Sequence, residues 1–508
     1  MQATSNRSKT NRPMIPSSVR SFIDGESWAQ AASAATIPCI SPADESVLTE
    51  LHEADQHQVD AAVASARRAF DSGPWPRMSV AERKRILLQI QQKIVDHADE
   101  LARLESIDAG LPLQGVVLGH VPRAAINFEF FAEVISQGAG EAYTQTHPYL
   151  SYVSREPVGV GALIGPWNIS LGLCTMKIAS CIAFGNTCVI KPSEYTPLSM
   201  RRFVELMHET DIPAGVVNLV NGSGQITGDA LVSHPDIDVV SFTGGTETAR
   251  VIMRSAAEYL KPVAFELGGK SANIICASAN LERALDGALF SIFSNNGEQC
   301  LAGSRVLVQR TIADEFIGRF VARTKNIRVG DPLNPETELG PLCYAGHLKK
   351  VLSYVDIARK EGDELLTGGK RHADFERGYY IEPTAVLAKS NKSRVCQEEI
   401  FGPFASFIVF DDVDEAISIA NDSDFGLVGY IWSEDLPTVM KVSRSVRAGT
   451  IWANTPMTRE MRAPFGGYKS SGIGRDSARD CMEFFTEAKT TTLPTEDFSF
   501  QRFGDQES

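Results

Sequence analysis

The stretch DVVSFTGGTETAR, from Asp238 to Arg250, places a short apolar run, a pair of glycines and the start of a helical pattern in direct succession. A buried strand that turns tightly into a helix has this order, because glycine permits the turn. The runs VGVGALIG, NTCVIKP, VVNLVNG and AFELGG also end in turn residues, and helical segments alternate with them. This alternation predicts buried parallel strands joined by helical crossovers.

A second alternation and an early helical region complete the pattern. Val59, Val63 and Ala66 recur at helical spacing, and Ser79 and Glu82 form a capping-box pattern ahead of a further helix. The runs VLVQR, ASFIVFD and TIWANTP follow later in the chain, with the helical segment ADEFIGRFVARTKNI among them. We therefore expect an α/β fold in which two α/β units share a cleft.

The composition limits the classes of function. A chain of 508 residues is too long for one core, and its formal net charge of −14 repels nucleic acid and anionic membranes. No apolar run approaches the roughly 18 residues that span a bilayer. The nine cysteines include no CxxC pair, and the histidines show no HExxH spacing. We expect no nucleic-acid or membrane partner, no disulfide framework, no metal, and a reducing, cytoplasmic location.

The first residues, MQATSNRSKTNRPMIP, are basic and polar and have no apolar core. A secretory signal needs such a core, so this segment is not one. Arg7, Lys9 and Arg12 leave a transit peptide open as an alternative. The favoured interpretation is a disordered tail over residues 1–20.

Three strand ends carry features suited to a dinucleotide, although no GxGxxG motif follows any strand. NGSGQITG, ending at Gly228, and FTGGTETAR, beginning at Phe242, each open a helix with glycines, where backbone N–H groups can bind an anion. In VIKPSE, Lys191 can bond sugar hydroxyls, and Glu194 can accept from both hydroxyls of a ribose. Because Glu194 would repel a 2′-phosphate, we expect NAD rather than NADP. The alternatives are glycines that serve backbone geometry and an exposed ion pair.

NNGEQCLAGSR places Cys300 among small and polar residues after a long helical pattern. A nucleophilic cysteine needs a lowered thiol pKa, room for substrate and a donor for the oxyanion that its attack creates. Gly297 is expected to leave the approach unhindered. A buried structural cysteine is the alternative.

Two further segments add the other groups that acyl chemistry requires. FELGGKS places Glu266 at the end of an apolar strand, where a raised pKa would suit a general base acting through water. GPWNIS places Asn168 just past a strand, where its amide could donate to an oxyanion, or could cap a turn instead. A nucleophile, a base and an oxyanion donor at element ends are the minimum for chemistry through a thioester.

These motifs resemble the aldehyde dehydrogenase superfamily. GPWN, VIKPSE, FTGGTE, FELGGKS, NGEQCLAGSR, EEIFGPF and PFGGYKSSGIGRD occur in family order, and the resemblance runs from about Ser21 to Thr491. It implies a Rossmann-type NAD-binding domain over 21–140 and 158–265 and an α/β catalytic domain over 266–480. It also implies oligomerisation strands over 141–157 and 481–500, with the strand near Thr490 pairing to the earlier segment in a homodimer or homotetramer.

The resemblance also implies residue roles. Cys300 matches the nucleophile, Glu266 the base that activates water, and Asn168 the oxyanion donor, together with the Cys300 backbone N–H. Family members that transfer the acyl group to coenzyme A lack the base, so the implied product is a free acid. The position of Asp476 departs from the glutamate common in the family, which puts a proton-relay role in doubt. The implied NAD contacts are Ile164, Trp167, Lys191, Glu194, Gly224, Gly228, Phe242, Gly245, Leu267, Glu399 and Phe401.

Substrate choice rests on less regular segments. HVPRAAINFEFFAEV brings Arg123, and TREMRAPFGG brings Arg462 and Phe465, towards the expected substrate tunnel. Both segments resemble those of the muconate-semialdehyde dehydrogenases, in which arginines at these positions hold acid groups of the substrate. The alternative is that both arginines form structural salt bridges.

The sequence thus favours NAD-dependent oxidation of a carboxylated, unsaturated semialdehyde from aromatic-ring cleavage. Two alternatives stay open. One is a broader aldehyde dehydrogenase for aromatic or aliphatic aldehydes. The other is a structural or binding protein that kept the fold and lost the chemistry.

Overall fold

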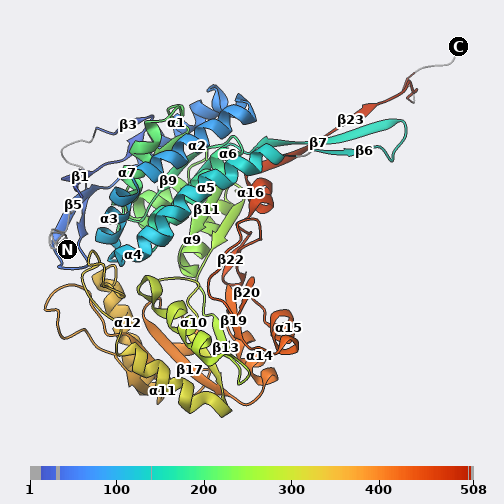
Figure 1. Ribbon diagram of the computed structural model, residues 1–508. Coiled ribbons are helices and arrows are strands. Elements are labelled where there is room, and N and C mark those ends of the chain that lie inside the picture. Colours follow the sequence, from blue (N-terminus) through green and yellow to red (C-terminus); the bar gives the residue numbers. More distant parts are fainter. Residues whose placement is uncertain (1–12, 30–34, 139, 501–502, 505–508) are drawn as a thin grey trace, which may run out of the picture.

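The computed structural model describes residues 13–29, 35–138, 140–500 and 503–504. Two sheets, of eight and seven strands, form the centres of two α/β units. Figure 1 shows the first unit, mostly blue to green, above the second, mostly yellow to red, with a narrow arm of strands projecting from the first. The predicted fold class, a Rossmann-type unit with a second α/β unit and a strand-based arm, is confirmed.

The eight-stranded sheet has the order β22-β12-β11-β8-β9-β10-β2-β3, and its five central strands are parallel. The five apolar runs that predicted parallel strands supply these central strands. The order reverses between β8 and β11, which makes a crevice at the carboxyl ends of the strands. The strands are β22 (Gly472–Ile473), β12 (Val263–Glu266), β11 (Val239–Thr243), β8 (Val160–Ile164), β9 (Thr187–Lys191), β10 (Val217–Leu219), β2 (Phe22–Ile23) and β3 (Glu26–Ser27).

Helices cover both faces of this sheet. The capping box is present, because Ser79 Oγ accepts from the Glu82 N–H and the Glu82 carboxylate accepts from the Ser79 N–H. The helix that follows buries Ile86 and Ile90 in the core. One face packs against α1 (Gln56–Asp71), α8 (Asp229–Val232) and α9 (Thr246–Ala257). The other packs against α2 (Val80–Asp96), α3 (Ala98–Ala109), α5 (Val121–Val134), α6 (Ser170–Ala183) and α7 (Leu198–His208).

The seven-stranded sheet has the order β15-β16-β17-β14-β13-β19-β20 and is parallel except at the edge pair β15 and β16. Its strands are β15 (Glu364–Thr367), β16 (Thr384–Leu387), β17 (Phe404–Phe410), β14 (Arg305–Gln309), β13 (Ala272–Ile275), β19 (Val428–Trp432) and β20 (Thr450–Ala453). One face packs against α10 (Leu281–Phe293) and α11 (Ala313–Thr324). The other packs against α12 (Ala345–Glu361), α13 (Arg394–Gln397), α14 (Val413–Asn421) and α15 (Leu436–Ser445).

The projecting arm is a sheet of three antiparallel strands, β6 (Glu141–Tyr143), β7 (Tyr149–Pro157) and β23 (Thr486–Pro494). Thr490 lies opposite Val153 in this pairing. Two predicted boundaries need correction. Residues 481–485 belong to a helix, α16 (Ala478–Phe485), so the last strand begins at Thr486. Strand β22 lies within 266–480 but joins the first sheet, because it pairs with β12.

The start of the described chain is partly ordered. Residues 1–12 of the predicted tail lie outside the described residues, but β1 (Ser18–Val19) pairs with β5 (Val47–His52), which corrects the tail boundary at residue 20. None of the helices among the described residues is long and apolar enough to cross a membrane. The remaining elements are β4 (Thr36–Ile40), β18 (Phe425–Gly426), β21 (Tyr468–Lys469), α4 (Leu113–Gly115), the π-helices η2 (Val116–His120) and η4 (Gly224–Gly228), and the short 3-10 segments η1 (Trp75–Arg77), η3 (Ile135–Gln137), η5 (Ser294–Gly297) and η6 (Arg310–Ile312).

Candidate active site

A cavity of about 1030 Å³ lies at the carboxyl ends of β8, β9, β11 and β12, and residues of the second unit close its other side. This is the crevice in which open α/β sheets bind ligands. Every residue predicted to be catalytic or to bind the cofactor lines it. They are Ile164, Trp167, Asn168, Lys191, Glu194, Gly224, Gly228, Phe242, Gly245, Glu266, Leu267, Cys300, Glu399 and Phe401.

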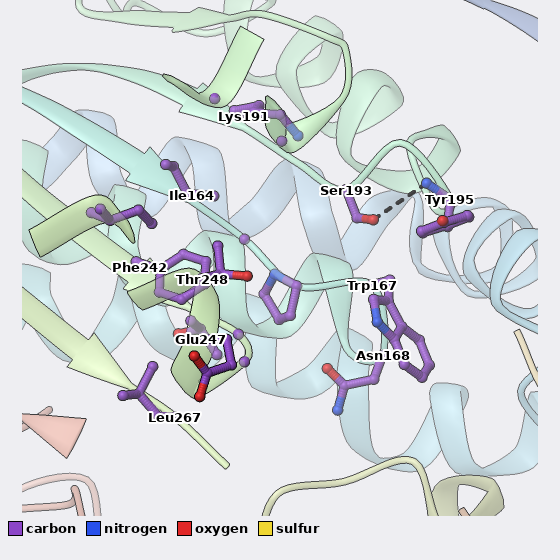
Figure 2. Close-up of a pocket in the computed structure, with 18 of the residues that line it drawn as sticks. Ile164, Trp167, Asn168, Lys191, Ser193, Tyr195, Phe242, Glu247, Thr248 and Leu267 are labelled. Carbon is purple, nitrogen blue, oxygen red and sulfur yellow. Dashed lines mark hydrogen bonds between the residues drawn. The ribbon is translucent and has the colours of Figure 1, made fainter. Parts of the chain in front are cut away.

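The wall from the first unit consists of strand ends. Figure 2 shows Ile164 and Phe242 on one side of the view, and Trp167 and Asn168, which follow the end of β8, on the other. Lys191 Nζ donates to the Pro192 carbonyl at 3.0 Å and lies 3.6 Å from Glu194 Oε2. Burial lowers the pKa of Lys191, and the charge of Glu194 opposes that shift. That this pair contacts a ribose stays a prediction.

Two glycines of this wall leave open space above the backbone. Gly224 begins η4, and Gly245 is the residue before α9. A Cβ atom at either position would meet no atom within 4 Å. The first N–H groups of a helix have no helical partner, so the start of α9 offers free donors to the cavity. The residues present therefore fit a phosphate-bearing cofactor.

The loop before Cys300 is a rigid left-handed turn. Asn295, Asn296 and Gly297 have φ angles of 53°, 57° and 69°. A Cβ on Gly297 would lie 2.4 Å from the carbonyl carbon of Gly402, so only glycine fits there. The expectation that Gly297 leaves the approach to the thiol open is thus corrected, because this glycine packs against another loop.

Glycines also bring the end of β12 against the Cys300 loop. A Cβ on Gly268 would lie 2.3 Å from Glu399 Oε2, and one on Gly269 would lie 2.5 Å from the Cys300 carbonyl oxygen. Instead, the Gly269 N–H donates to Glu399 Oε1 at 2.8 Å. All three of Glu266, Cys300 and Glu399 line the cavity, and both carboxylates lie near enough to Cys300 for their charges to act on its thiol.

The surroundings of Cys300 and Glu266 change the pKa values of both groups. Burial, followed by the charges of Glu399 and Glu266, raises the pKa of Cys300 to about 12. The thiol therefore does not have the lowered pKa that a nucleophilic cysteine needs, because burial and two nearby carboxylates raise it. Burial, and then the charge of Asp476, also raises the pKa of Glu266 well above its ordinary value. A carboxylate with a raised pKa is a stronger base.

Asn168 is held in a buried hydrogen-bond network. Its amide nitrogen donates to the Glu298 carbonyl at 2.7 Å, and Asn295 Nδ2 donates to the Asn168 carbonyl at 3.2 Å. An amide nitrogen carries two hydrogens, so one remains for another acceptor. Since Glu298 is two residues before Cys300 in the chain, this bond fixes Asn168 relative to the thiol.

An aromatic cluster forms part of the wall. The Trp167 ring lies 5.6 Å from Tyr344, 5.1 Å from His347 and 5.3 Å from Phe401, centroid to centroid. Phe401 has a φ of 65°, and His347 Nε2 lies 2.6 Å from its carbonyl oxygen. Burial lowers the pKa of His347 to about 3, so its ring is neutral and donates this bond.

Sequence reasoning missed three lining residues of the second unit: Tyr344, His347 and Lys350. They lie before or within the first turns of α12, where the helical pattern gives no sign of a site. An aromatic residue and a histidine three positions apart in the stretch YAGH were the available signal.

The substrate-side predictions have mixed outcomes. Phe465 belongs to an apolar cluster against which Cys300 packs, and its place in a substrate tunnel stays a prediction. Arg123 lies in the first turn of α5, and its Nε donates to Asn127 Oδ1 at 2.9 Å. Arg123, Phe465 and Arg462 are all absent from the lining of the cavity. The side chain of Arg462 is 77% exposed and paired with Glu460 at 2.9 Å, so its predicted contact with substrate is corrected.

Comparison with known proteins identifies the family. Residues 28–491 match the aldehyde dehydrogenase family. The chain is 43% identical to the 5-carboxymethyl-2-hydroxymuconate semialdehyde dehydrogenase of Escherichia coli over 84% of this chain and 92% of that one. It is 39% identical to the 2-hydroxymuconic semialdehyde dehydrogenase of Pseudomonas sp. (strain CF600) over 93% and 98% of the two chains. The solved P. syringae AldA indole-3-acetaldehyde dehydrogenase, a mutant in complex with NAD+ and IAA, superimposes with a TM-score of 0.92 at 40% identity, covering 96% of this chain and 98% of that one. The chain therefore belongs to the aldehyde dehydrogenase family, whose members are oxidoreductases acting on aldehydes.

Proposed function

We propose that the protein oxidises a carboxylated semialdehyde of the muconate type, from aromatic catabolism, to the carboxylic acid with NAD. The observation that carries this proposal is the convergence of Cys300, Glu266 and Asn168 in the cavity that the predicted cofactor residues line. A nucleophile, a base and an amide donor at one end of a cofactor-sized cavity support acyl chemistry.

The chain's own residues support NAD binding. The open space over Gly224 and Gly245 would take the pyrophosphate, and Lys191 with Glu194 would hold the adenosine ribose. A 2′-phosphate would meet the Glu194 carboxylate, so NAD is preferred over NADP. Bound NAD+ would supply the hydride acceptor and a positively charged ring near the thiol. Such a charge would counter the two carboxylates that raise the pKa of Cys300.

In the first half of the reaction, deprotonated Cys300 Sγ adds to the aldehyde carbon, and the carbonyl π electrons move to oxygen. The Asn168 amide and the Cys300 backbone N–H donate to the resulting oxyanion. Loss of hydride from this thiohemiacetal leaves a thioester on Cys300. In the second half, Glu266 takes a proton from water, the hydroxide adds to the thioester, and the carbon–sulfur bond breaks to release the acid.

The proposed substrate class has two supports. Two relatives at about 40% identity are named for muconate-type semialdehydes. Arg123, which the resemblance assigns to the substrate's acid group, is a buried cation near Asp476 in a chain whose formal net charge is −14. We further propose that the arm of β6, β7 and β23 joins copies of the chain in a homodimer or homotetramer, since it projects from the body as a small sheet with exposed side chains.

The test is the formation of NADH from aldehydes by the native protein and by Cys300→Ser. The native protein should form NADH, and the variant should lose at least about 10³-fold in rate, because hydroxyl is a far weaker nucleophile here. NADH formation by Cys300→Ser at the native rate would contradict the proposal. Stoichiometric labelling of Cys300 without any turnover would favour the catalytically silent alternative.

A further inference from the structure

The loop that carries the proposed nucleophile is fastened at two points to the segment just before α12. Asn296 Oδ1 accepts from the Gly340 N–H at 2.7 Å. Glu298 makes the second contact, because its Oε1 accepts from the Cys343 N–H at 3.0 Å. These bonds couple the position of the loop to the position of that segment.

The backbone of Glu298 sets the position of the proposed oxyanion donor. Its carbonyl accepts from Asn168 Nδ2 at 2.7 Å and from Asn295 Nδ2 at 3.0 Å. Its N–H donates to the Asn295 carbonyl at 2.8 Å. Glu298 also precedes Cys300 by two residues. A shift of Glu298 would therefore displace both the amide that donates to the oxyanion and the sulfur that attacks the aldehyde.

The carboxyl group of Glu298 is completely buried. Its Oε2 has no hydrogen-bond partner among the described residues. In the same part of the chain, the only basic side chain within ion-pair distance is that of His347, whose Nε2 lies 3.5 Å from Oε1. The hydrogen on this nitrogen is already donated to the Phe401 carbonyl at 2.6 Å, so Glu298 gains little from it.

The groups around Glu298 favour its uncharged form. The titratable side chains that face it are those of Cys343, Tyr344 and His347. Burial raises the pKa of the thiol and of the phenol, and it lowers the pKa of the imidazole to about 3, so all three are uncharged at neutral pH. Burial also raises the pKa of Glu298 well above its ordinary value, against smaller effects of the Cys343 N–H and the Asn296 side chain. A buried carboxyl group without a cation beside it takes up a proton instead of carrying a charge.

We propose that Glu298 is a positioning residue of this site, and that it holds Asn168 and the Cys300 loop in place as an uncharged carboxylic acid. This inference rests on the proposed function, because the groups that Glu298 positions are the proposed oxyanion donor and nucleophile. Glu298 does not line the cavity, so it acts through these two residues. Glutamine, which is similar in shape and has an acceptor oxygen, should be able to replace it, whereas leucine cannot accept from the Cys343 N–H.

The first test measures NADH formation from glutarate semialdehyde at neutral pH by the native protein, Glu298→Gln, Glu298→Leu and Glu282→Gln. Glu298→Leu should lower kcat at least about tenfold and change KM for NAD and for the aldehyde less than about threefold, because the oxyanion donor acts in the transition state. Glu298→Gln should keep kcat within about threefold of the native value. Glu282→Gln removes an exposed carboxylate of α10, is the control, and should have no effect.

The second test determines the charge of Glu298 without turnover. It compares the free energy of unfolding in urea of the native protein and of Glu298→Gln between about pH 6 and about pH 9. The unfolded chain releases the Glu298 proton at about pH 4.3, whereas the folded chain keeps it to higher pH. The native protein should therefore lose stability relative to Glu298→Gln as the pH rises, by up to about tenfold in the unfolding equilibrium constant for each pH unit. The difference between the native protein and Glu282→Gln should stay constant.

Three results would overturn the inference. The first is a loss of kcat in Glu298→Gln as large as that in Glu298→Leu, which would show that the charge is needed. The second is a Glu298→Leu variant that keeps the native kcat, or whose KM values rise as much as its kcat falls. The third is a difference in stability between the native protein and Glu298→Gln that does not depend on pH, which would show that Glu298 is ionised in the fold.

The two tests separate this inference from the proposed function. A native protein that forms no NADH from any aldehyde would overturn the proposed function, and the positioning role with it. The stability comparison needs neither NAD nor turnover, so it would still decide the charge of Glu298. Native NADH formation together with any of the three contrary results would overturn the role of Glu298 alone.

Discussion

The wall of the cavity around Cys300 and the loop that carries Arg459 are built in different ways. The wall consists of strand ends and a left-handed turn, with backbone contacts so close that only glycine fits at Gly269 and Gly297. The loop, residues 454–467, has no helix or strand between β20 and β21, and it leaves Arg462 in solvent. The Nε atom of its Arg459 is buried and has no hydrogen-bond partner in the described part of the chain. The fold thus holds the residues proposed for the chemistry, whereas the loop is a segment that can change without disturbing them.

The largest effect is expected from a substitution at Gly297, in the turn that precedes Cys300. The substitution Gly297→Ala forces a Cβ to 2.4 Å from the backbone of Gly402 at a φ of 69°, so the Cys300 loop must shift. We expect the free energy of unfolding to fall by about 2–4 kcal/mol and NADH formation to fall more than about tenfold.

Urea unfolding and the NADH assay would measure these effects. Gly318→Ala, a helical position with open space around it, is the control and should be neutral or slightly stabilising. Full activity of Gly297→Ala would show that the turn does not position the thiol.

A second prediction concerns Glu194 and the preference for NAD over NADP. Removal of its carboxylate in Glu194→Gln should relieve repulsion of a 2′-phosphate and shift the ratio of kcat/KM with NADP to that with NAD by about tenfold, or about 1.4 kcal/mol. Steady-state kinetics with both cofactors measure the shift. Glu247→Gln removes another carboxylate of the same cavity, at the start of α9, and should shift the ratio much less. Equal shifts in the two variants would argue against a specific role for Glu194.

The smallest effect is expected where the two regions meet, at Asp476. Its negative charge raises the pKa of Glu266, so Asp476→Asn should lower that pKa. Glu266 acts as a base when deprotonated, and the rate falls as the pH drops through its pKa. The acidic limb of the pH–rate profile should therefore move to lower pH. Glu483→Gln, an exposed position on α16, should leave it in place. A limb that moves to higher pH in Asp476→Asn would reverse the assigned sign.

The sequence predicted the position of a residue where a regular helix or strand sets that position. It did not predict properties that depend on a distant segment or on an irregular loop. Glu266 and Lys191 were predictable because each ends a buried strand of a recognisable parallel sheet. The raised pKa of Cys300 was not, because Glu399 reaches the sulfur from 99 residues further along the chain.

The loop of residues 454–467 could not be predicted from the sequence either. Arg459 and Arg462 stand three residues apart in a segment without periodicity, so the sequence gives no sign of which guanidinium turns inward. A resemblance to relatives selected Arg462. In the structure, the guanidinium of Arg459 stacks on Phe465, whereas Arg462 pairs with Glu460 at the surface.

The proposed mechanism requires that Cys300 forms a thioester and that Glu266 activates the water that hydrolyses it. The most direct measurement is mass spectrometry of Glu266→Gln, quenched with acid after mixing with NAD and glutarate semialdehyde. We predict a burst of about one NADH per active site and an acyl group on the peptide that contains Cys300, with little turnover afterwards. A burst without an adduct on Cys300, or steady turnover at the native rate, would contradict this mechanism.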